Sequence, residues 1–289
     1  MIKHKIFGLL LFMLPVAACF AQLNPLTAQY FNNRYLINPA FAGEQQDTRL
    51  NMAYRSQWNN IPGAPITQSL TLDHGFEKVG LGLNVSNDKA GLIRQTNVAG
   101  SFAYHLPLGE TDRLNFGISM GFTNQRINQG DIIGNQGDVM VGRYNDRETY
   151  LDGSFGVAYT ASKLTLQASI PNLKQVFKRD ITYADLTSFY TAASYKINFE
   201  EGADASSVEP LVAYRGVYGY DNMWDAGAQL NLSGQLLLST IYHSTKSATF
   251  GAGMDFRKKY LLTAQYTSNT SVLNSYSNGS FELNLRIRW

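Results

Sequence analysis

The last nine residues, FELNLRIRW, alternate strictly between apolar and polar side chains. Phe281, Leu283, Leu285, Ile287 and Trp289 are apolar, and the residues between them are polar or charged. A repeat of two is the period of a β-strand, in which successive side chains point to opposite faces. The segment therefore predicts a strand with one apolar face and one polar face.

Segments with the same alternation recur from residue 48 to the end of the chain. We count fourteen, most of them about 8–11 residues long: 48–58, 66–73, 79–85, 98–106, 114–122, 151–159, 164–170, 189–199, 208–215, 224–232, 235–242, 250–256, 260–267 and 280–289. Strands of soluble proteins average about 5–6 residues, whereas a tilted strand that crosses a bilayer needs about 9–11. The segment lengths therefore favour strands that cross a membrane.

Charged side chains in these segments fall on the phase opposite to the large apolar ones. They are Arg55, Asp152, Lys196, Arg215, Asp225, Asp255, Glu282, Arg286 and Arg288. A lysine or arginine facing lipid near the bilayer midplane would cost about 2–4 kcal/mol. The pattern predicts an all-β fold, a single transmembrane antiparallel β-barrel of about 14 strands over residues 48–289, with lipid on the apolar face.

The connections between the segments differ in length in the way that an outer-membrane barrel requires. If both termini are periplasmic, every second connection is external and is expected to be the longer one. The external set is 59–65, 86–95, 123–149, 171–188, 216–223, 243–247 and 268–279. The periplasmic set is 74–78, 107–113, 161–163, 200–207, 233–234 and 257–259. The first set is longer on the whole, which supports the count of fourteen.

Residues 1–21 have the layout of a secretory signal peptide, with two lysines ahead of an apolar run and cleavage after Ala21. As an alternative, the stretch VAAC resembles a bacterial lipobox, in which Cys19 would be the lipidated first residue. Cys19 is the only cysteine, so cleavage after Ala21 leaves a chain without disulfides or thiolate ligands. Residues 22–47 would then be an N-terminal periplasmic segment.

This segment is rich in aromatic residues, so we expect it to fold into or against the periplasmic mouth of the barrel, with a flexible lead as the alternative.

The polar phase of the strands carries many small residues. They are Ala99, Ser101, Ala103, Gly117, Ser119, Gly121, Ser154, Gly156, Ala158, Gly251 and Gly253. Small inward side chains leave either an open passage or room for something that fills it.

Composition excludes several function classes. The chain has 24 Lys+Arg against 22 Asp+Glu, a net charge of +2, and no basic tail. It therefore lacks the excess of positive charge that is expected of a protein that binds nucleic acid. His105 falls on the polar phase and is expected to be a satisfied lumenal histidine. The pair His243 and Ser244 could suggest a lipase, but no orienting acid follows from the spacing.

One connection could suggest a calcium site. Asp131, Asp138 and Asp146 lie in a loop rich in Asn and Gly, but their spacing does not follow the EF-hand pattern, which favours a solvated loop. We therefore expect a protein that is not an enzyme and that has no catalytic residue, metal or cofactor.

The stretch QYFNNRYLINPAFAG, followed by AYRSQWNNIPGAPITQSLTL, resembles the opening signature of the PorP/SprF family of Bacteroidetes. The matching positions are Gln29, Tyr30, Asn38, Pro39, Ala40, Phe41, Ala42, Gly43, Tyr54, Arg55, Gln57, Trp58, Gly63, Ala64, Pro65 and Gln68. The stretches SIPNL, VEPLVAYR and YSNGSFELNLRIRW agree further on. The resemblance covers essentially the whole mature chain.

The resemblance implies an outer-membrane component of the type IX secretion system, linked in some members to gliding motility. Its partners would be a periplasmic ring or peptidoglycan-linked component, or a large surface adhesin, besides outer-membrane lipid. The candidates for partner contact among the matching positions are Tyr30, Asn38, Pro39, Gly43, Arg55, Trp58, Pro65 and Gln68. Phe281, Leu283, Leu285, Ile287 and Trp289 resemble the signal by which such barrels are recognised for assembly.

Two functions are compatible with this pattern. The first is a non-enzymatic scaffold or anchor for protein secretion, and the second is a pore for small solutes, since fourteen strands can enclose a channel.

The motifs also predict local structure. Asn38-Pro39 suits a fixed turn, and the run from Ile61 to Pro65 suits a hairpin tip. Arg55 lies on the inward phase, so we hypothesise that it pins the N-terminal segment from inside the barrel.

Overall fold

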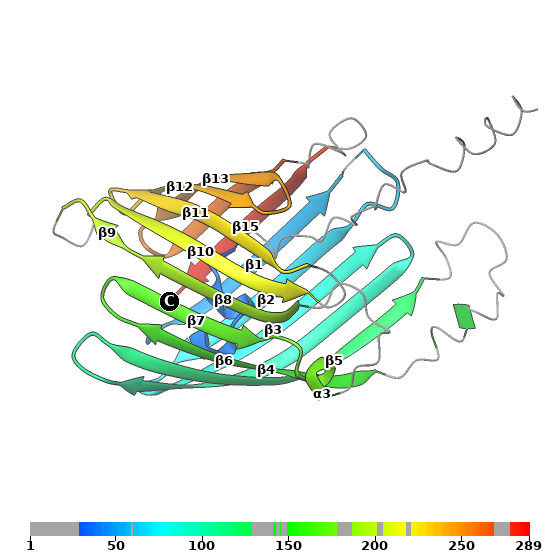
Figure 1. Ribbon diagram of the computed structural model, residues 1–289, viewed down its shortest axis with the longest axis horizontal. Coiled ribbons are helices and arrows are strands. Elements are labelled where there is room, and N and C mark those ends of the chain that lie inside the picture. Colours follow the sequence, from blue (N-terminus) through cyan, green and yellow to red (C-terminus); the bar gives the residue numbers. More distant parts are fainter. Residues whose placement is uncertain are drawn as a thin grey trace, which may run out of the picture.

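The computed structural model describes residues 29–58, 60–128, 141–142, 145, 149–177, 187–200, 205–217, 221–268 and 278–289. Its strands form one antiparallel sheet that closes on itself (Figure 1). They are β1 Thr48–Gln57, β2 Ile66–Gly75, β3 Val79–Ala90, β4 Ile93–Pro107, β5 Arg113–Ile127, β6 Tyr150–Thr160, β7 Leu164–Ile170, β8 Thr187–Tyr195, β9 Ile197–Asn198, β10 Ser207–Val217, β11 Met223–Leu232, β12 Leu236–His243, β13 Ser247–Phe256, β14 Tyr260–Thr267 and β15 Ser280–Arg288.

The barrel has fourteen strands, as the sequence predicts. The short strand β9 continues the line of β8, because both pair with β10, and the two together act as one strand. The seam is made by β1 and β15, which pair from Arg49 opposite Arg288 to Gln57 opposite Ser280. Closure pairs the first and last strands of the sheet with each other, as β-structure in a bilayer requires.

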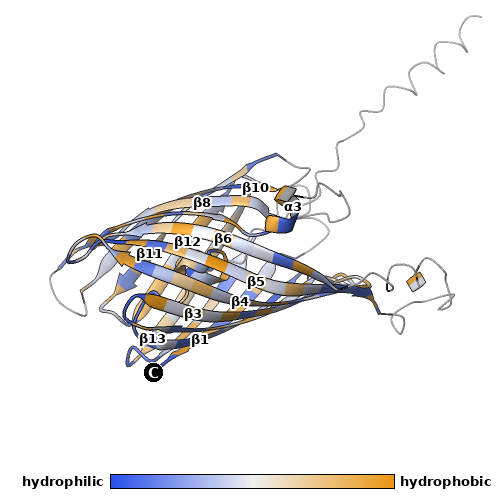
Figure 2. Ribbon diagram, turned by 90° about the horizontal axis from the view of Figure 1, so that it is seen from below, coloured by the Kyte–Doolittle hydropathy of each residue, from blue (hydrophilic) through white to orange (hydrophobic). Residues whose placement is uncertain are grey.

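Side chains alternate between lipid and lumen along each strand, and apolar and polar residues alternate along the ribbons in Figure 2. On β5, Ile118 and Met120 are 51% and 63% exposed on the outside, while Asn115 is fully buried inside. On β15, Phe281 and Leu283 are exposed, and Glu282 between them is buried. The apolar face of the closing strand therefore points outward, as its period predicts.

The two ends of the barrel differ. The short-turn end holds the connections 76–78, 108–112, 161–163, 233–235 and 257–259, together with Trp289, whose backbone pairs with that of Thr48. The long-loop end holds the connections after β1, β3, β5, β7, β10, β12 and β14. The structure does not place these ends relative to the cell, so the periplasmic location of the termini stays a prediction.

The prediction of an external loop over residues 86–95 is wrong. Strands β3 and β4 run on to a two-residue turn at Gly91 and Leu92, where Gly91 has φ +59°. Polar side chains occupy both faces of this extension, so it lacks the alternation that reveals a strand. Its ladder continues without a break, since Asp88 pairs with Gln95 and Lys89 with Arg94.

Two of the connections show local structure within the described residues. The connection after β7 contains a short helix, α3 Leu173–Phe177. At the predicted hairpin tip, Gly63 has φ +76° and the Ala64 N–H donates to the Ile61 carbonyl over 3.2 Å, as in a Pro-Gly turn. No helix within the described residues has the length and apolar character needed to cross a membrane. The predicted signal peptide, residues 1–21, lies outside the described residues, as do Asp131, Asp138 and Asp146.

The outward face predicts a graded response to charge. We expect Ile118→Arg, well inside the span, to lower the free energy of unfolding by about 2–4 kcal/mol, because the guanidinium would face lipid. Leu108→Arg is the matched control, because Leu108 is 57% exposed in the β4–β5 turn, and it should cost only about 0–1 kcal/mol. Urea unfolding in lipid vesicles measures both, and equal losses would contradict the outward assignment.

Candidate functional site: a plug inside the barrel

Residues 29–47, here called the plug, lie inside the barrel (Figure 1). The plug contains two 3-10 helices, η1 Arg34–Leu36 and η2 Pro39–Phe41, and η2 packs on β4, β5 and β6. Tyr30, Ala40 and Phe41 are at most 3% exposed. The room left by the small inward residues is therefore filled by the chain itself, at least along this wall.

The conformation of the plug follows from a few residues. Asn38 caps η2, because its side-chain oxygen accepts from the Ala40 N–H over 3.0 Å, and Pro39 occupies the first helical position. Gly43 then adopts φ +60°, a conformation that favours glycine, and its N–H donates to Asp73 Oδ2 over 3.0 Å. The Asn-Pro-Ala-Phe-Ala-Gly stretch thus fixes the turn that leads into β1.

Glycines of the wall make this approach possible. A Cβ added at Gly80 would overlap the Ala42 carbonyl, and one at Gly156 would overlap the Asn38 side chain. At Gly117 it would overlap the plug backbone next to Pro39. These three positions, here called the contact glycines, let the plug approach the backbone of the strands directly.

One end of the plug is held by a buried polar network. The Tyr30 hydroxyl donates to Asp225 Oδ2 over 2.7 Å, and burial raises the pKa of Tyr30, which keeps the hydroxyl protonated. Asp225 Oδ1 lies 2.7 Å from His243 Nδ1, and His243 Nε2 lies 2.8 Å from Thr249 Oγ1. The Arg215 Nε lies 3.5 Å from Asp225. Asp225 is thus surrounded by donors, and the network fixes Tyr30 against β10–β13.

This network includes an acid that sequence reasoning missed. Asp225 orients His243, whereas Ser244 accepts from the Trp224 N–H instead of pairing with His243. Asp225, His243 and Thr249 are at most 1% exposed, so the triplet serves to anchor Tyr30. The signal for it was the shared inward phase of β11, β12 and β13, but only the register brings the three residues together.

A second anchor connects the plug to the seam. Gln29 Nε2 donates to Glu282 Oε1 over 2.7 Å, and Glu282 lies opposite Arg55 in the β1–β15 register. Both charged side chains are at most 4% exposed. Arg55 therefore lies in the lumen as predicted, opposite the Glu282 that binds the plug.

The remaining contacts of the plug are distributed over the wall. Tyr35 donates to Ser101 Oγ over 2.9 Å, and Arg34 forms an ion pair with Glu209. His105 is satisfied, as predicted, because Nδ1 lies 2.7 Å from Asn115 Oδ1 and Nε2 lies 3.0 Å from the Ala42 carbonyl. The plug is thus bound to strands on several sides of the lumen.

The structure gathers some of the predicted contact residues and separates others. Tyr30, Asn38, Pro39 and Gly43 belong to the plug, and Arg55 is buried on β1 opposite Glu282. Trp58 and Pro65 lie at the β1–β2 hairpin, where the Trp58 N–H donates to the Gly279 carbonyl over 3.1 Å. Gln68 is exposed and accepts from Asn87 Nδ2 over 3.4 Å. The eight residues therefore do not form one surface.

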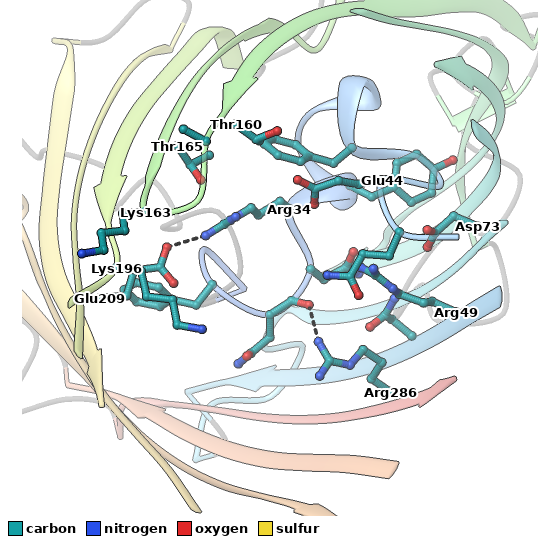
Figure 3. Close-up of a pocket in the computed structure, with 18 of the residues that line it drawn as sticks. Arg34, Glu44, Arg49, Asp73, Thr160, Lys163, Thr165, Lys196, Glu209 and Arg286 are labelled. Carbon is teal, nitrogen blue, oxygen red and sulfur yellow. Dashed lines mark hydrogen bonds and ion pairs between the residues drawn. The ribbon is translucent and has the colours of Figure 1, made fainter. Parts of the chain in front are cut away.

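A cavity of about 360 Å³, here called the mouth cavity, lies between the plug and the wall (Figure 3). It extends to the β6–β7 turn at the short-turn end. Its charged lining consists of Arg34, Arg49, Lys163, Lys196 and Arg286 together with Glu44, Asp73 and Glu209. No group of His, Cys, Asp and Glu able to hold a metal occurs among the residues that the structure describes.

Comparison with known proteins gives one family and several solved structures of similar fold. The family model described as type IX secretion system membrane protein PorP/SprF matches residues 19–287. The outer membrane protein Omp33 of Acinetobacter baumannii is similar in structure, with a TM-score of 0.51 and 9% identity over 84% of this chain and 99% of that one. The toluene transporter TbuX of Ralstonia pickettii has a TM-score of 0.50 and 10% identity over 87% and 91%. No curated protein matches the sequence.

The contact glycines predict how the plug can be loosened. In Gly80→Ala with Gly156→Ala, the added methyl groups would displace the plug, so a cysteine at Ala42, now buried, should become reactive to a thiol reagent. Gly100→Ala is the matched control, because a Cβ at Gly100 meets nothing within 4 Å. Mass spectrometry of the labelled barrel measures the reaction. Equal labelling in both backgrounds would show that the glycines do not hold the plug.

The second anchor predicts coupling between β1 and β15. We expect Arg55→Ala to lower the free energy of unfolding by about 3–5 kcal/mol, because it leaves Glu282 buried without its facing cation. Adding Glu282→Gln should recover part of that loss. A double-mutant cycle by urea unfolding measures the coupling, and additive effects would contradict it.

Proposed function

Since the chain belongs to the PorP/SprF family of type IX secretion system membrane proteins, we propose that it is a non-enzymatic scaffold or anchor of that system in the outer membrane. The observation that carries the proposal is the plug. Its residues are bound to the wall through Asp225, Glu282 and Glu209, so much of the lumen is committed to the chain's own N-terminal segment. A barrel occupied in this way is better suited to hold partners than to pass solutes.

The proposed orientation places the short-turn end in the periplasm. Outer-membrane barrels have short periplasmic turns and longer external loops. Thr48 and Trp289 lie at the short-turn end, so the plug, β1 and the closing strand meet there. This end would meet a periplasmic ring or peptidoglycan-linked component. The long-loop end would meet a large surface adhesin, which is how a role in gliding motility would arise.

A pore for small solutes is the second candidate. It is favoured by the mouth cavity, which shows that the lumen is not filled evenly. TbuX is named as a toluene transporter, but a likeness at 10% identity concerns the fold alone. The two candidates differ in the role of the plug. A scaffold keeps the plug in the lumen, whereas a pore must displace it to open a passage.

Two measurements on the same purified barrel separate the candidates. We expect the tagged protein, extracted from outer membranes in mild detergent, to bring secretion-system proteins or a surface adhesin with it in mass spectrometry. In planar bilayers it should conduct little, while Gly80→Ala with Gly156→Ala should conduct more and Gly100→Ala should not. A solitary barrel with stable channels would favour the pore and contradict the scaffold.

A further inference from the structure

Two of the basic side chains that line the mouth cavity are not engaged in ion pairs within the described part of the barrel. Three of its five cations are already paired: Arg34 with Glu209, Arg49 Nε with Asp47 Oδ1 over 2.9 Å, and Arg286 Nη2 with Asp255 Oδ2 over 3.7 Å. Lys163 and Lys196 form no ion pair with any residue that the structure describes. Among the basic side chains of the lining, these two are thus the ones outside the ion pairs of the described wall.

The fold holds the two lysines close together. Lys163 belongs to the tight turn between β6 and β7, and Lys196 lies between β8 and β9. The Lys196 N–H donates to the Lys163 carbonyl over 2.7 Å, so their backbones are directly paired. Neighbouring like charges repel each other, and an anion placed between them would relieve that repulsion.

The wall beside the lysines also offers hydroxyl groups. Thr165 is buried on β7, and Thr160 and Ser162 line the same part of the cavity. Ammonium and hydroxyl groups together can donate several hydrogen bonds to one carboxylate. This side of the mouth cavity is therefore suited to an anion.

The opposite side of the cavity has the reverse character. Glu44 and Asp73 lie across it from the two lysines in Figure 3. The volume of about 360 Å³ is within the range of roughly 300–1,000 Å³ that is common for ligand sites. A ligand that matches both sides has an acidic group at one place and hydrogen-bond donors at another.

We propose that the mouth cavity binds an acidic polypeptide segment of a partner, with a carboxylate against Lys163 and Lys196 and backbone N–H groups toward Glu44 and Asp73. A polypeptide supplies both kinds of group, whereas a small anion would use only one side. The proposal rests on the scaffold function and deepens it, because it names the chemistry by which a partner is held at the short-turn end.

The test uses the full barrel in detergent and a fluorescein-labelled, C-terminally amidated peptide of alternating Gly and Glu, with a Gln version as its neutral match. We expect binding of the Glu peptide in fluorescence anisotropy and much weaker binding of the Gln peptide. Lys163→Gln with Lys196→Gln should weaken binding on the order of tenfold, as loss of two partly exposed charge pairs implies.

The matched control is Lys78→Gln with Lys259→Gln. Both residues lie in exposed turns at the same end but outside the cavity, so the net charge changes equally and binding should stay as it was. Equal weakening in the control would mean non-specific attraction and would overturn the site. Absence of binding, or full displacement by free glutarate at the affinity of the peptide, would also overturn it.

The same variants separate this proposal from the scaffold function. If outer-membrane extracts yield secretion-system partners and Lys163→Gln with Lys196→Gln does not reduce their recovery, the scaffold stands and the mouth site falls. If the wild-type barrel recovers no partner, the scaffold falls, and the peptide measurement still decides whether the site binds acidic chains.

Discussion

The whole structure depends on pairing every backbone N–H and C=O of the strands where no water is available. In a bilayer each unpaired group costs several kcal/mol, so the sheet must close, and β1 must meet β15. Closure creates an interior whose surface is polar, because the apolar phase of each strand already faces lipid. This polar interior must then be occupied either by protein or by water. Here residues 29–47 fill part of it, and the mouth cavity remains.

The plug shows how a polar interior can be packed tightly. Its apolar side chains gather in small clusters, such as Tyr35 and Phe41 against Ala103 and Ala158, and its backbone rests on glycines. Its first residues, Gln29 and Tyr30, are held by the buried carboxylates Glu282 and Asp225, which lie on different strands. Removing one member of such a set leaves the others without compensation, so the anchors add specificity for one arrangement of the plug.

The sequence predicts the barrel well because alternation is a local signal. The period of Phe281–Trp289 or of Leu114–Phe122 can be recognised without knowing what lies next to it. The polar extension of β3 and β4 lacks that signal, which is why the prediction of a loop over residues 86–95 is wrong. The site is harder to predict, since Asp225, His243 and Thr249 meet only through the register of three strands. The motif around Asn38 marks the importance of the segment but not the wall that it touches.

The covalent link between the plug and β1 has a consequence for biogenesis. Thr48 joins the plug to the first strand, and that strand is also one half of the seam. The partners of the plug lie on strands from β2 to β15, among them Asp73, Asp225 and Glu282, so they are complete only after the whole sheet has formed. The plug therefore reaches its full set of contacts only in the sealed barrel, because Gln29 binds Glu282 of the strand that closes the seam.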